Sequence, residues 1–135
     1  MTSIPTPFAA QSHPGVLQAF HDAILESTGR HLLVLVDGLG WDTVSDYRGY
    51  MRALKPIVHE GRRETSILPS TTASALTSYF TGASPLEHGV LGYTTLNARG
   101  VAISQLHGAP GLHGDTWRGG TTLGTTAIER GRRVA

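Results

Sequence analysis

Five hydroxyl side chains crowd the start of a predicted helix, PSTTASALTSYFTG, at residues 69–82. One hydroxyl at a helix start is an ordinary cap, which accepts a hydrogen bond from a backbone N–H group. A second hydroxyl can be a nucleophile, because the helix N-terminus carries partial positive charge and N–H donors for an anion. The hydroxyls belong to Ser70, Thr71, Thr72, Ser74 and Thr77.

Asp37 is a candidate metal ligand. A threonine hydroxyl is a poor nucleophile at neutral pH, so it needs a base or a metal ion to activate it. Asp37 follows the apolar run at 32–36 and precedes a glycine turn. A carboxylate at the carboxyl end of a buried strand projects into the crevice where α/β proteins bind ligands. The alternative for Asp37 is to cap a helix that begins near Trp41, just as capping is the alternative for each hydroxyl.

The elements that must position these residues follow from the apolar periodicity. Residues 14–29 repeat apolar side chains at helical spacing. Residues 32–36 are a continuous branched apolar run, which is typical of a parallel strand buried on both faces. Residues 41–61 favour helix with an interruption at Pro56, and residues 64–69 favour a short strand.

The later part of the chain continues this alternation. A helix at 69–82 leads through a turn-rich connection into a hairpin, whose strands GYTTL and VAISQL flank a turn at 97–100. A glycine-rich loop at 108–120 precedes a last helix at 121–131. The alternation predicts an α/β fold with an open, mostly parallel sheet and helices on both faces, preceded by a flexible tail at 1–13.

Length and composition set further bounds. The chain has 135 residues, about one domain, with 39% apolar residues and a formal net charge of +1. So small a charge gives no attraction to nucleic acid or acidic lipid, and we expect neither a nucleic-acid polymer nor a membrane as partner. The absence of cysteine excludes disulfides and thiolate metal sites. We see no signal-peptide pattern and no apolar run near the roughly 20 residues of a membrane span, so we expect a cytoplasmic protein.

Four short motifs stand in a definite order along the chain. They are Asp37-Gly38 after the first apolar run, Pro69 to Thr72 at the start of a helix, Thr81-Gly82 at its end, and Pro85 to His88-Gly89 in the following turn. In this order and at these spacings, residues 30–93 resemble the N-terminal part of the alkaline phosphatase superfamily. The closest resemblance is to its type I phosphodiesterase and nucleotide pyrophosphatase branch.

The resemblance implies a metal-dependent phosphoesterase. Thr72 matches the nucleophile, which also coordinates a metal ion, and counting back from Gly82 favours Thr72 over Thr71. Asp37 matches a ligand of the same metal ion. Two zinc ions would stabilise the entering and leaving oxygens. The implied substrate is a small phosphate ester or nucleotide, hydrolysed through a phosphothreonine intermediate.

The sequence departs from the family pattern in two ways. Tyr93 stands where the pyrophosphatase branch has an asparagine that contacts the phosphate. A phenol can donate one hydrogen bond, but we expect Tyr93 to pack. Two zinc ions need about six or more ligands, and only Asp37 and Thr72 match. We therefore expect residues 14–135 to be the N-terminal portion of a catalytic domain that is truncated at its C-terminus. We expect this portion to be inactive by itself, and the sequence predicts no particular oligomeric state.

Other residues carry less specific signals. His107, His113 and Asp115 could bind a metal ion, but their spacing fits no ordinary zinc pattern and a solvated loop is expected. A second class of function stays open, namely a non-catalytic α/β module that binds phosphate or a single metal ion at the helix start. The aromatic residues that could stack a base but are expected to pack are Trp41, Trp117, Tyr47 and Tyr50.

Overall fold

The computed structural model describes residues 15–97, 99–105, 107 and 121–134. The chain divides into two compact units. One unit is Leu32–Glu64, and the other joins Met1–His31 to Thr65–Ala135. The expected tail at 1–13 and the glycine-rich loop at 108–120 lie outside the described residues. Each unit is described by itself below.

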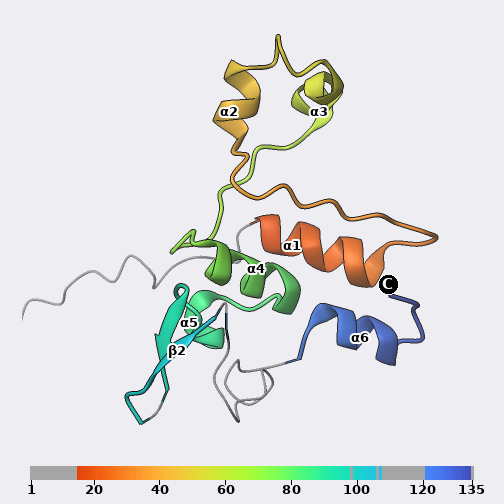
Figure 1. Cartoon of the computed structure of the whole chain (residues 1–135). Coiled ribbons are helices and arrows are strands. Elements are labelled where there is room, and N and C mark those ends of the chain that lie inside the picture. The colour runs from red at the N-terminus through yellow and green to blue at the C-terminus, as the bar shows by residue number, and fades with distance from the viewer. Residues whose placement is uncertain (1–14, 98, 106, 108–120, 135) are drawn as a thin grey trace, which may run out of the picture. The chain divides into compact units, whose positions relative to one another are not determined.

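In the larger unit, helix α1 packs against helix α4 (Figure 1). Helix α1, Gly15–His21, continues into a turn of π-helix, η1, at Asp22–Glu26. Helix α4 spans Thr72–Thr81 and ends at Gly82, which adopts a left-handed conformation with φ of 73°. Glycine is the residue that reaches this conformation most easily. Both helices were predicted from the apolar periodicity, and both are confirmed with bounds a few residues shorter.

The apolar core of this unit forms between α1 and α4. It consists of Leu17, Phe20, Ile67 and Tyr79, which are all buried. The rings of Phe20 and Tyr79 stack with centroids 4.8 Å apart, and the Tyr79 hydroxyl bonds to Ser66 Oγ over 2.9 Å. Burial of apolar surface is the main favourable term in folding, so this cluster holds α4 in place.

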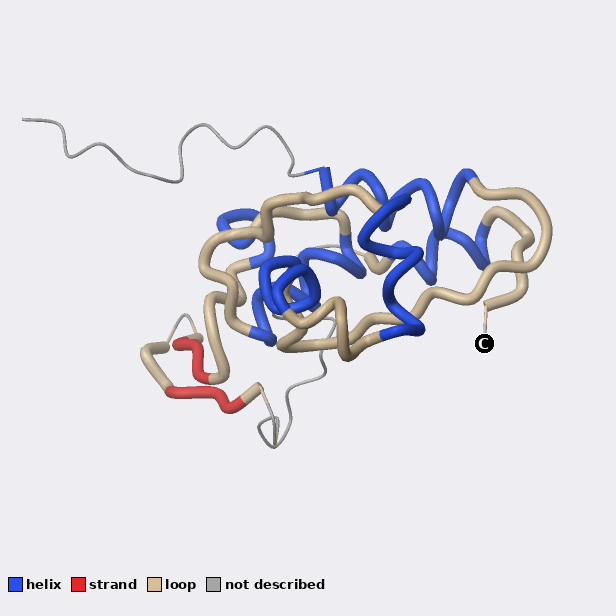
Figure 2. Tube along the Cα trace, turned by 90° about the horizontal axis from the view of Figure 1, so that it is seen from above, coloured by secondary structure: helices blue, strands red, loops and turns tan. Residues whose placement is uncertain are grey.

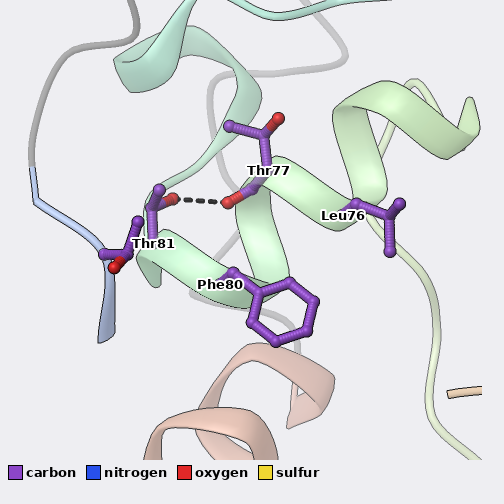
Figure 3. Close-up of a pocket in the computed structure, with 5 residues that line it drawn as sticks. Leu76, Thr77, Phe80 and Thr81 are labelled. Atoms are coloured by element: carbon purple, nitrogen blue, oxygen red, sulfur yellow. Dashed lines mark hydrogen bonds between the residues drawn. The ribbon is translucent and has the colours of Figure 1, made fainter. Parts of the chain in front are cut away.

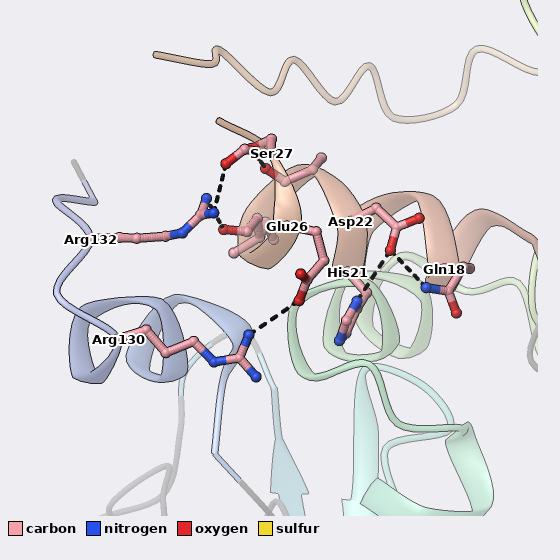
Figure 4. Close-up of polar contacts among 9 residues, drawn as sticks. Gln18, His21, Asp22, Glu26, Ser27, Arg130 and Arg132 are labelled. Carbon is pink, nitrogen blue, oxygen red and sulfur yellow. Dashed lines mark hydrogen bonds and ion pairs between the residues drawn. The ribbon is translucent and has the colours of Figure 1, made fainter. Parts of the chain in front are cut away.

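Helix α6, Leu123–Glu129, packs against η1 at the other end of α1 (Figure 4). Leu25, Leu123 and Ala127 form a second buried cluster there. The guanidinium of Arg132 donates to the carbonyl oxygens of Ile24 and Ser27 over 3.1 and 2.6 Å. These bonds supply donors to carbonyl oxygens at the end of a helix, which have no N–H partner within it. The predicted last helix is thereby confirmed and anchored.

The predicted hairpin is confirmed. Strand β1, Thr94–Leu96, pairs antiparallel with β2, Ala102–Ser104, and both strands are drawn in red in Figure 2. Thr95 lies opposite Ile103 in this pairing. Asn97 closes the turn, because its side-chain oxygen accepts from the N–H groups of Arg99 and Val101, both over 2.9 Å. Asparagine commonly organises turns through such bonds.

The two predicted parallel strands are wrong for this structure. Residues 32–36 form no strand, and their side chains are exposed, from 40% at Leu35 to 88% at Leu32. Residues 64–69 form no strand either, although Ile67 is buried. A parallel strand needs hydrogen-bonded neighbours. In the described parts of the chain, the sheet is limited to β1 and β2, so the predicted open parallel sheet is not present there.

The smaller unit has three short helices in place of one. They are α2 at Trp41–Asp46, the 3-10 helix η2 at Arg52–Leu54 and α3 at Lys55–Glu60. Pro56 lies in the first turn of α3, where a missing N–H costs nothing, so it starts a helix instead of interrupting one. Across the described portions of both units, no helix has the length and apolar character needed to cross a membrane.

Candidate active site

The N-terminus of α4 is capped by Thr71. Its Oγ1 accepts a hydrogen bond from the N–H of Ser74 over 3.4 Å and donates one to the carbonyl oxygen of Leu91 over 3.0 Å. Thr71 has extended backbone geometry, as a cap residue requires. Its hydroxyl proton is thus used in a structural bond. For Thr71, the capping alternative is the one that the structure bears out.

Thr72 is the first residue of α4, and its side chain is half-buried. It lines a hollow of about 250 Å³ at the helix start. Two walls meet here: α4 supplies one, and the segment around the hairpin supplies the other. The residues that line the hollow are Thr72, Ala73, Leu76, Thr77, Tyr93 and Gln105. Of the two neighbouring residues Thr71 and Thr72, Thr72 is therefore the one that lines a space that a substrate could enter.

The other hydroxyls of the stretch have structural positions. Thr77 Oγ1 donates to the carbonyl oxygen of Ala73 over 2.7 Å. Ser74 and Ser78 are fully buried on one face of α4. The Ser74 hydroxyl has no hydrogen-bond partner within the described part of the chain. Ser74 and Ser78 are thus buried, and Thr77, which also lines the hollow, is bonded to the helix backbone.

His88 is buried in the turn that follows α4. This turn forms the short helix α5, Pro85–His88, and His88 is 1% exposed. Its Nδ1 accepts from the N–H of Val90 over 3.0 Å, so Nε2 carries the proton and donates to Ser78 Oγ over 2.8 Å. Burial lowers the pKa of His88, since the charged imidazolium would be desolvated, although the nearby Glu87 carboxylate opposes this shift. His88 is therefore neutral, and its hydrogen bond to Ser78 links α5 to α4.

Two bonds fasten the segment 88–93 alongside α4. The bond from His88 to Ser78 holds its beginning, and the bond from Thr71 to Leu91 holds its middle. Tyr93 is the last residue of this segment and lines the same hollow as Thr72. Its side chain is 45% exposed, so Tyr93 is not buried in a core, and the expectation that it packs instead of contacting the phosphate stays a prediction. The cause of its exposure is this double anchor, which sets Tyr93 at the open edge of the helix start.

Gln105 completes the hollow, and it was expected only as one residue of the predicted strand VAISQL. Its N–H donates to the carbonyl oxygen of Tyr93 over 2.7 Å, and its side-chain amide donates to Thr95 Oγ1 over 2.9 Å. Because β1 and β2 pair in register from Thr94 to Ser104, the next residue on β2 comes beside Tyr93. The register of the hairpin is the signal that places Gln105 beside Tyr93.

A second hollow of about 210 Å³ lies further along α4 (Figure 3). Leu76, Thr77, Phe80, Thr81 and Thr122 line it. The Thr81 hydroxyl donates to the carbonyl oxygen of Thr77 over 2.6 Å. This hollow has no titratable side chain in its lining, so it offers no acid, base or charged ligand for chemistry.

Asp37 lies in the smaller unit, in an exposed turn after residues 32–36. Gly38 beside it has φ of 73°, as expected for a sharp glycine turn. The N-cap position of α2 is Gly40, three residues after Asp37. Thr72 belongs to the other unit. That these two residues bind one metal ion therefore stays a prediction.

The donors for a metal ion are incomplete in the part of the chain that the structure describes. No group of three or more His, Cys, Asp or Glu residues there could hold a metal ion. Asp37 and Thr72 are oxygen donors of a kind that zinc accepts, but two donors do not fill a tetrahedral site. His107 is exposed and lies 3.2 Å from Ser104 Oγ, while His113 and Asp115 lie outside the described residues.

The aromatic residues with a possible stacking role are divided between core and surface. Trp41 is half-buried, whereas Tyr47 and Tyr50 are 55% and 90% exposed. The expectation that both tyrosines pack is wrong, because they lie at and beyond the end of the short helix α2. Trp117 lies outside the described residues.

The chain matches one protein family. The family model for type I phosphodiesterase / nucleotide pyrophosphatase covers residues 31–135, which include Asp37, all of α4 and Tyr93. Searches among curated proteins and among solved structures give no significant match. The match confirms the resemblance found from the sequence motifs. The cytoplasmic location and the zinc site are not addressed by it and stay predictions.

Proposed function

Because the chain belongs to the type I phosphodiesterase / nucleotide pyrophosphatase family, we propose that it is a metal-dependent phosphoesterase with Thr72 as its nucleophile. The family acts on small phosphate esters or nucleotides, and membership implies an α/β fold of the alkaline phosphatase type. One observation supports Thr72 above all. Thr72 is the first residue of α4 and lines the hollow at the helix start.

The start of α4 suits an attack on phosphorus. The N–H groups in the first turn of a helix have no acceptor within the helix, so they can receive phosphoryl oxygens. In the proposed reaction Oγ1 of Thr72 bonds to phosphorus and loses its proton, while the ester bond breaks and the departing oxygen takes up a proton. Water then cleaves the phosphothreonine and restores the hydroxyl. The fixed N–H donors stabilise the negative charge that develops.

A metal ion completes the proposal. Zinc, when bound, would lower the pKa of the attacking hydroxyl and neutralise the charge of the phosphate. Asp37 and Thr72 would each contribute one oxygen donor, and further donors would have to come from outside the described residues. Zinc binding by the full-length protein, measured by calorimetry, should weaken in Asp37→Asn. Unchanged affinity in that variant would contradict a ligand role for Asp37.

The experiment that tests the function compares two neighbouring threonines. We expect the full-length protein to hydrolyse bis(p-nitrophenyl) phosphate. Thr72→Ala should lower kcat/KM by at least about 10³-fold, since a nucleophile is lost. Thr71→Ala is the matched control, because it removes a cap that contributes about 1 kcal/mol of stability and leaves the nucleophile in place. A large loss in Thr71→Ala with activity retained in Thr72→Ala would overturn the assignment.

A non-catalytic role is the second candidate. The start of α4, whose first N–H groups can receive an anion, is the feature that such a module would use. In that case α4 would offer its N-terminus to phosphate, or Asp37 would bind a single metal ion. Titration with zinc and with inorganic phosphate separates the two functions. Stoichiometric binding of two zinc ions by the full-length protein supports the enzyme, whereas weak phosphate binding without hydrolysis supports the module.

A further inference from the structure

His88 uses both ring nitrogens to fix the start of the segment 88–93. Nε2 donates to Ser78 Oγ on α4 over 2.8 Å, and Nδ1 accepts from the backbone N–H of Val90 over 3.0 Å. The side chains of His88, Ser78 and Val90 are all buried. A neutral imidazole has one donor and one acceptor, so only the neutral ring with its proton on Nε2 makes both bonds.

A protonated His88 cannot keep the bond to Val90. An imidazolium carries a proton on each nitrogen, so both nitrogens are donors. The Nδ1–H group would then face the N–H of Val90 across 3.0 Å, and two donors form no hydrogen bond. The buried N–H would lose its acceptor and a positive charge would be desolvated beside it, and both changes are costly. The structure avoids both costs if the turn at His88 opens and the ring reaches water.

Glu87 is the charged group that acts on His88 within the described residues. Its carboxylate favours the imidazolium, but burial is the larger influence, and the pKa of His88 is lowered. Neither α4, which packs against α5, nor residues 89–92 carry a charged side chain. The titratable residue of α4 is Tyr79, and its hydroxyl bonds to Ser66 in the core. Nothing on α4 therefore compensates a positive charge on His88.

The segment 88–93 leads from His88 to the hollow at the start of α4. The carbonyl oxygen of Leu91 accepts from Thr71 Oγ1 over 3.0 Å, and this bond is exposed to water. Tyr93, at the end of the segment, lines the hollow. Once the turn at His88 opens, the buried attachment of the segment is lost, and the exposed bond has little net strength because water competes for both partners. Opening at His88 therefore extends to Tyr93.

We propose that His88 is a pH switch: its neutral form fastens the segment 88–93 to α4, and its protonated form releases this segment while the helices stay folded. Histidine suits this role because its charge changes near neutral pH. Release removes Tyr93 from the wall of the hollow at the start of α4. The switch is a property of the fold and requires no hydrolysis.

Acid favours the released segment. In the released form the ring of His88 is in water and has an ordinary pKa of about 6.5. In the fastened form burial lowers the pKa of His88, so the fastened form binds fewer protons. The equilibrium constant for release therefore rises as the pH falls below about 6.5, by at most about tenfold per pH unit.

Hydrogen exchange of single amides, followed by NMR, tests the switch in the 135-residue chain. The protection factor compares each amide with an unstructured peptide at the same pH, so it measures opening alone. The reporters are the amides of Gly89 and Val90, which donate to the Pro85 carbonyl oxygen and to His88 Nδ1. Their protection should fall by up to about tenfold per pH unit between about pH 6.5 and about pH 5. Small amounts of urea should leave this exchange unchanged, because a local opening exposes little surface.

Two variants that do not titrate assign the effect to His88. In His88→Asn the side-chain oxygen can accept from the N–H of Val90, and in His88→Gln the side-chain amide can donate to Ser78, but neither takes up a proton. In both variants the protection of Val90 should no longer depend on pH. His59→Asn is the matched control, because His59 is exposed at the end of α3, and it should keep the pH dependence.

Three results would overturn the switch. Protection of Gly89 and Val90 that stays constant below about pH 6.5 would show that protonation does not release the segment. A loss of protection that persists in both His88 variants would place the titrating group elsewhere. Exchange that urea accelerates as strongly as global unfolding would show that the segment opens only with the whole unit. The first and third results need only the unaltered chain, so they decide even where a variant fails to fold.

Discussion

Ile67 and Val34 occupy two apolar stretches that look alike in sequence and differ in the structure. Ile67 is 1% exposed and packs among residues of α1 and α4, whereas Val34 is 69% exposed in a segment without regular structure. Ile67 finds its apolar partners within its own unit, on helices that form from local signals. A parallel strand such as the one predicted at 32–36 gains its burial from neighbouring strands and covering helices. Apolar character therefore predicts burial only where the partners are supplied.

The largest expected effect is on stability, and it tests the difference in burial between Ile67 and Val34. Ile67→Ala should lower the free energy of unfolding by about 2–5 kcal/mol, because it opens a cavity in a packed cluster. Val34→Ala should change it by less than about 0.5 kcal/mol, because the side chain is already in water. Chemical denaturation of the 135-residue chain measures both values. A loss in Val34→Ala equal to that in Ile67→Ala would mean that residues 32–36 are buried after all.

A smaller effect on stability is expected to distinguish Ser78 from Ser74, two buried serines of α4. Ser78→Ala should cost about 1–3 kcal/mol, because the buried Nε2–H of His88 loses its acceptor. Ser74→Ala should be neutral or slightly stabilising, because the fully buried Ser74 hydroxyl has no partner among the described residues. The two serines lie one helical turn apart on the same face, so each is the control for the other. Equal losses of stability in both variants would show that the Ser74 hydroxyl makes a stabilising hydrogen bond.

The smallest effect concerns pH and compares a histidine from each unit. Burial lowers the pKa of His88 below its ordinary value of about 6.5, so the unfolded chain takes up a proton at a pH where the folded protein does not. The stability that the neutral, buried His88 contributes is fully present above about pH 6.5. It declines as the pH falls from there toward the pKa of His88 in the folded protein. The slope is at most about 1.4 kcal/mol per pH unit.

Thermal unfolding between pH 5 and pH 8 measures that slope. His88→Gln should remove it, since glutamine does not titrate. His59→Gln should leave it unchanged, because His59 is exposed at the end of α3. If the pH dependence of stability were lost in His59→Gln and kept in His88→Gln, the buried His88 would not be its source.

Features set by a few neighbouring residues could be predicted from the sequence. The cap and glycine end of α4, the hairpin with its turn at Asn97 and the last helix are confirmed, because each depends on bonds within a few positions. The strand at 32–36 could not be predicted in this way, since its pairing depends on distant partners. Pro56 was misread because a proline starts a helix as readily as it breaks one.

The candidate site was predictable only in part. Thr72 was chosen over Thr71 from the resemblance, and the bond from Thr71 to Leu91 supplies a structural reason that spans 20 positions. The exposure of Tyr93 depends on the anchors at His88 and Thr71, which no local pattern reveals. The partnership of Asp37 with Thr72 links two units and stays a prediction.

Trapping the covalent intermediate tests the role of Thr72 most directly. The full-length protein is quenched with acid during turnover of bis(p-nitrophenyl) phosphate, digested and examined by mass spectrometry. We predict a phosphate on Thr72 and on no other hydroxyl of residues 69–82, with no phosphate there in Thr72→Ala. Turnover that leaves phosphate on Thr71, or that proceeds undiminished in Thr72→Ala, would contradict Thr72 as the nucleophile.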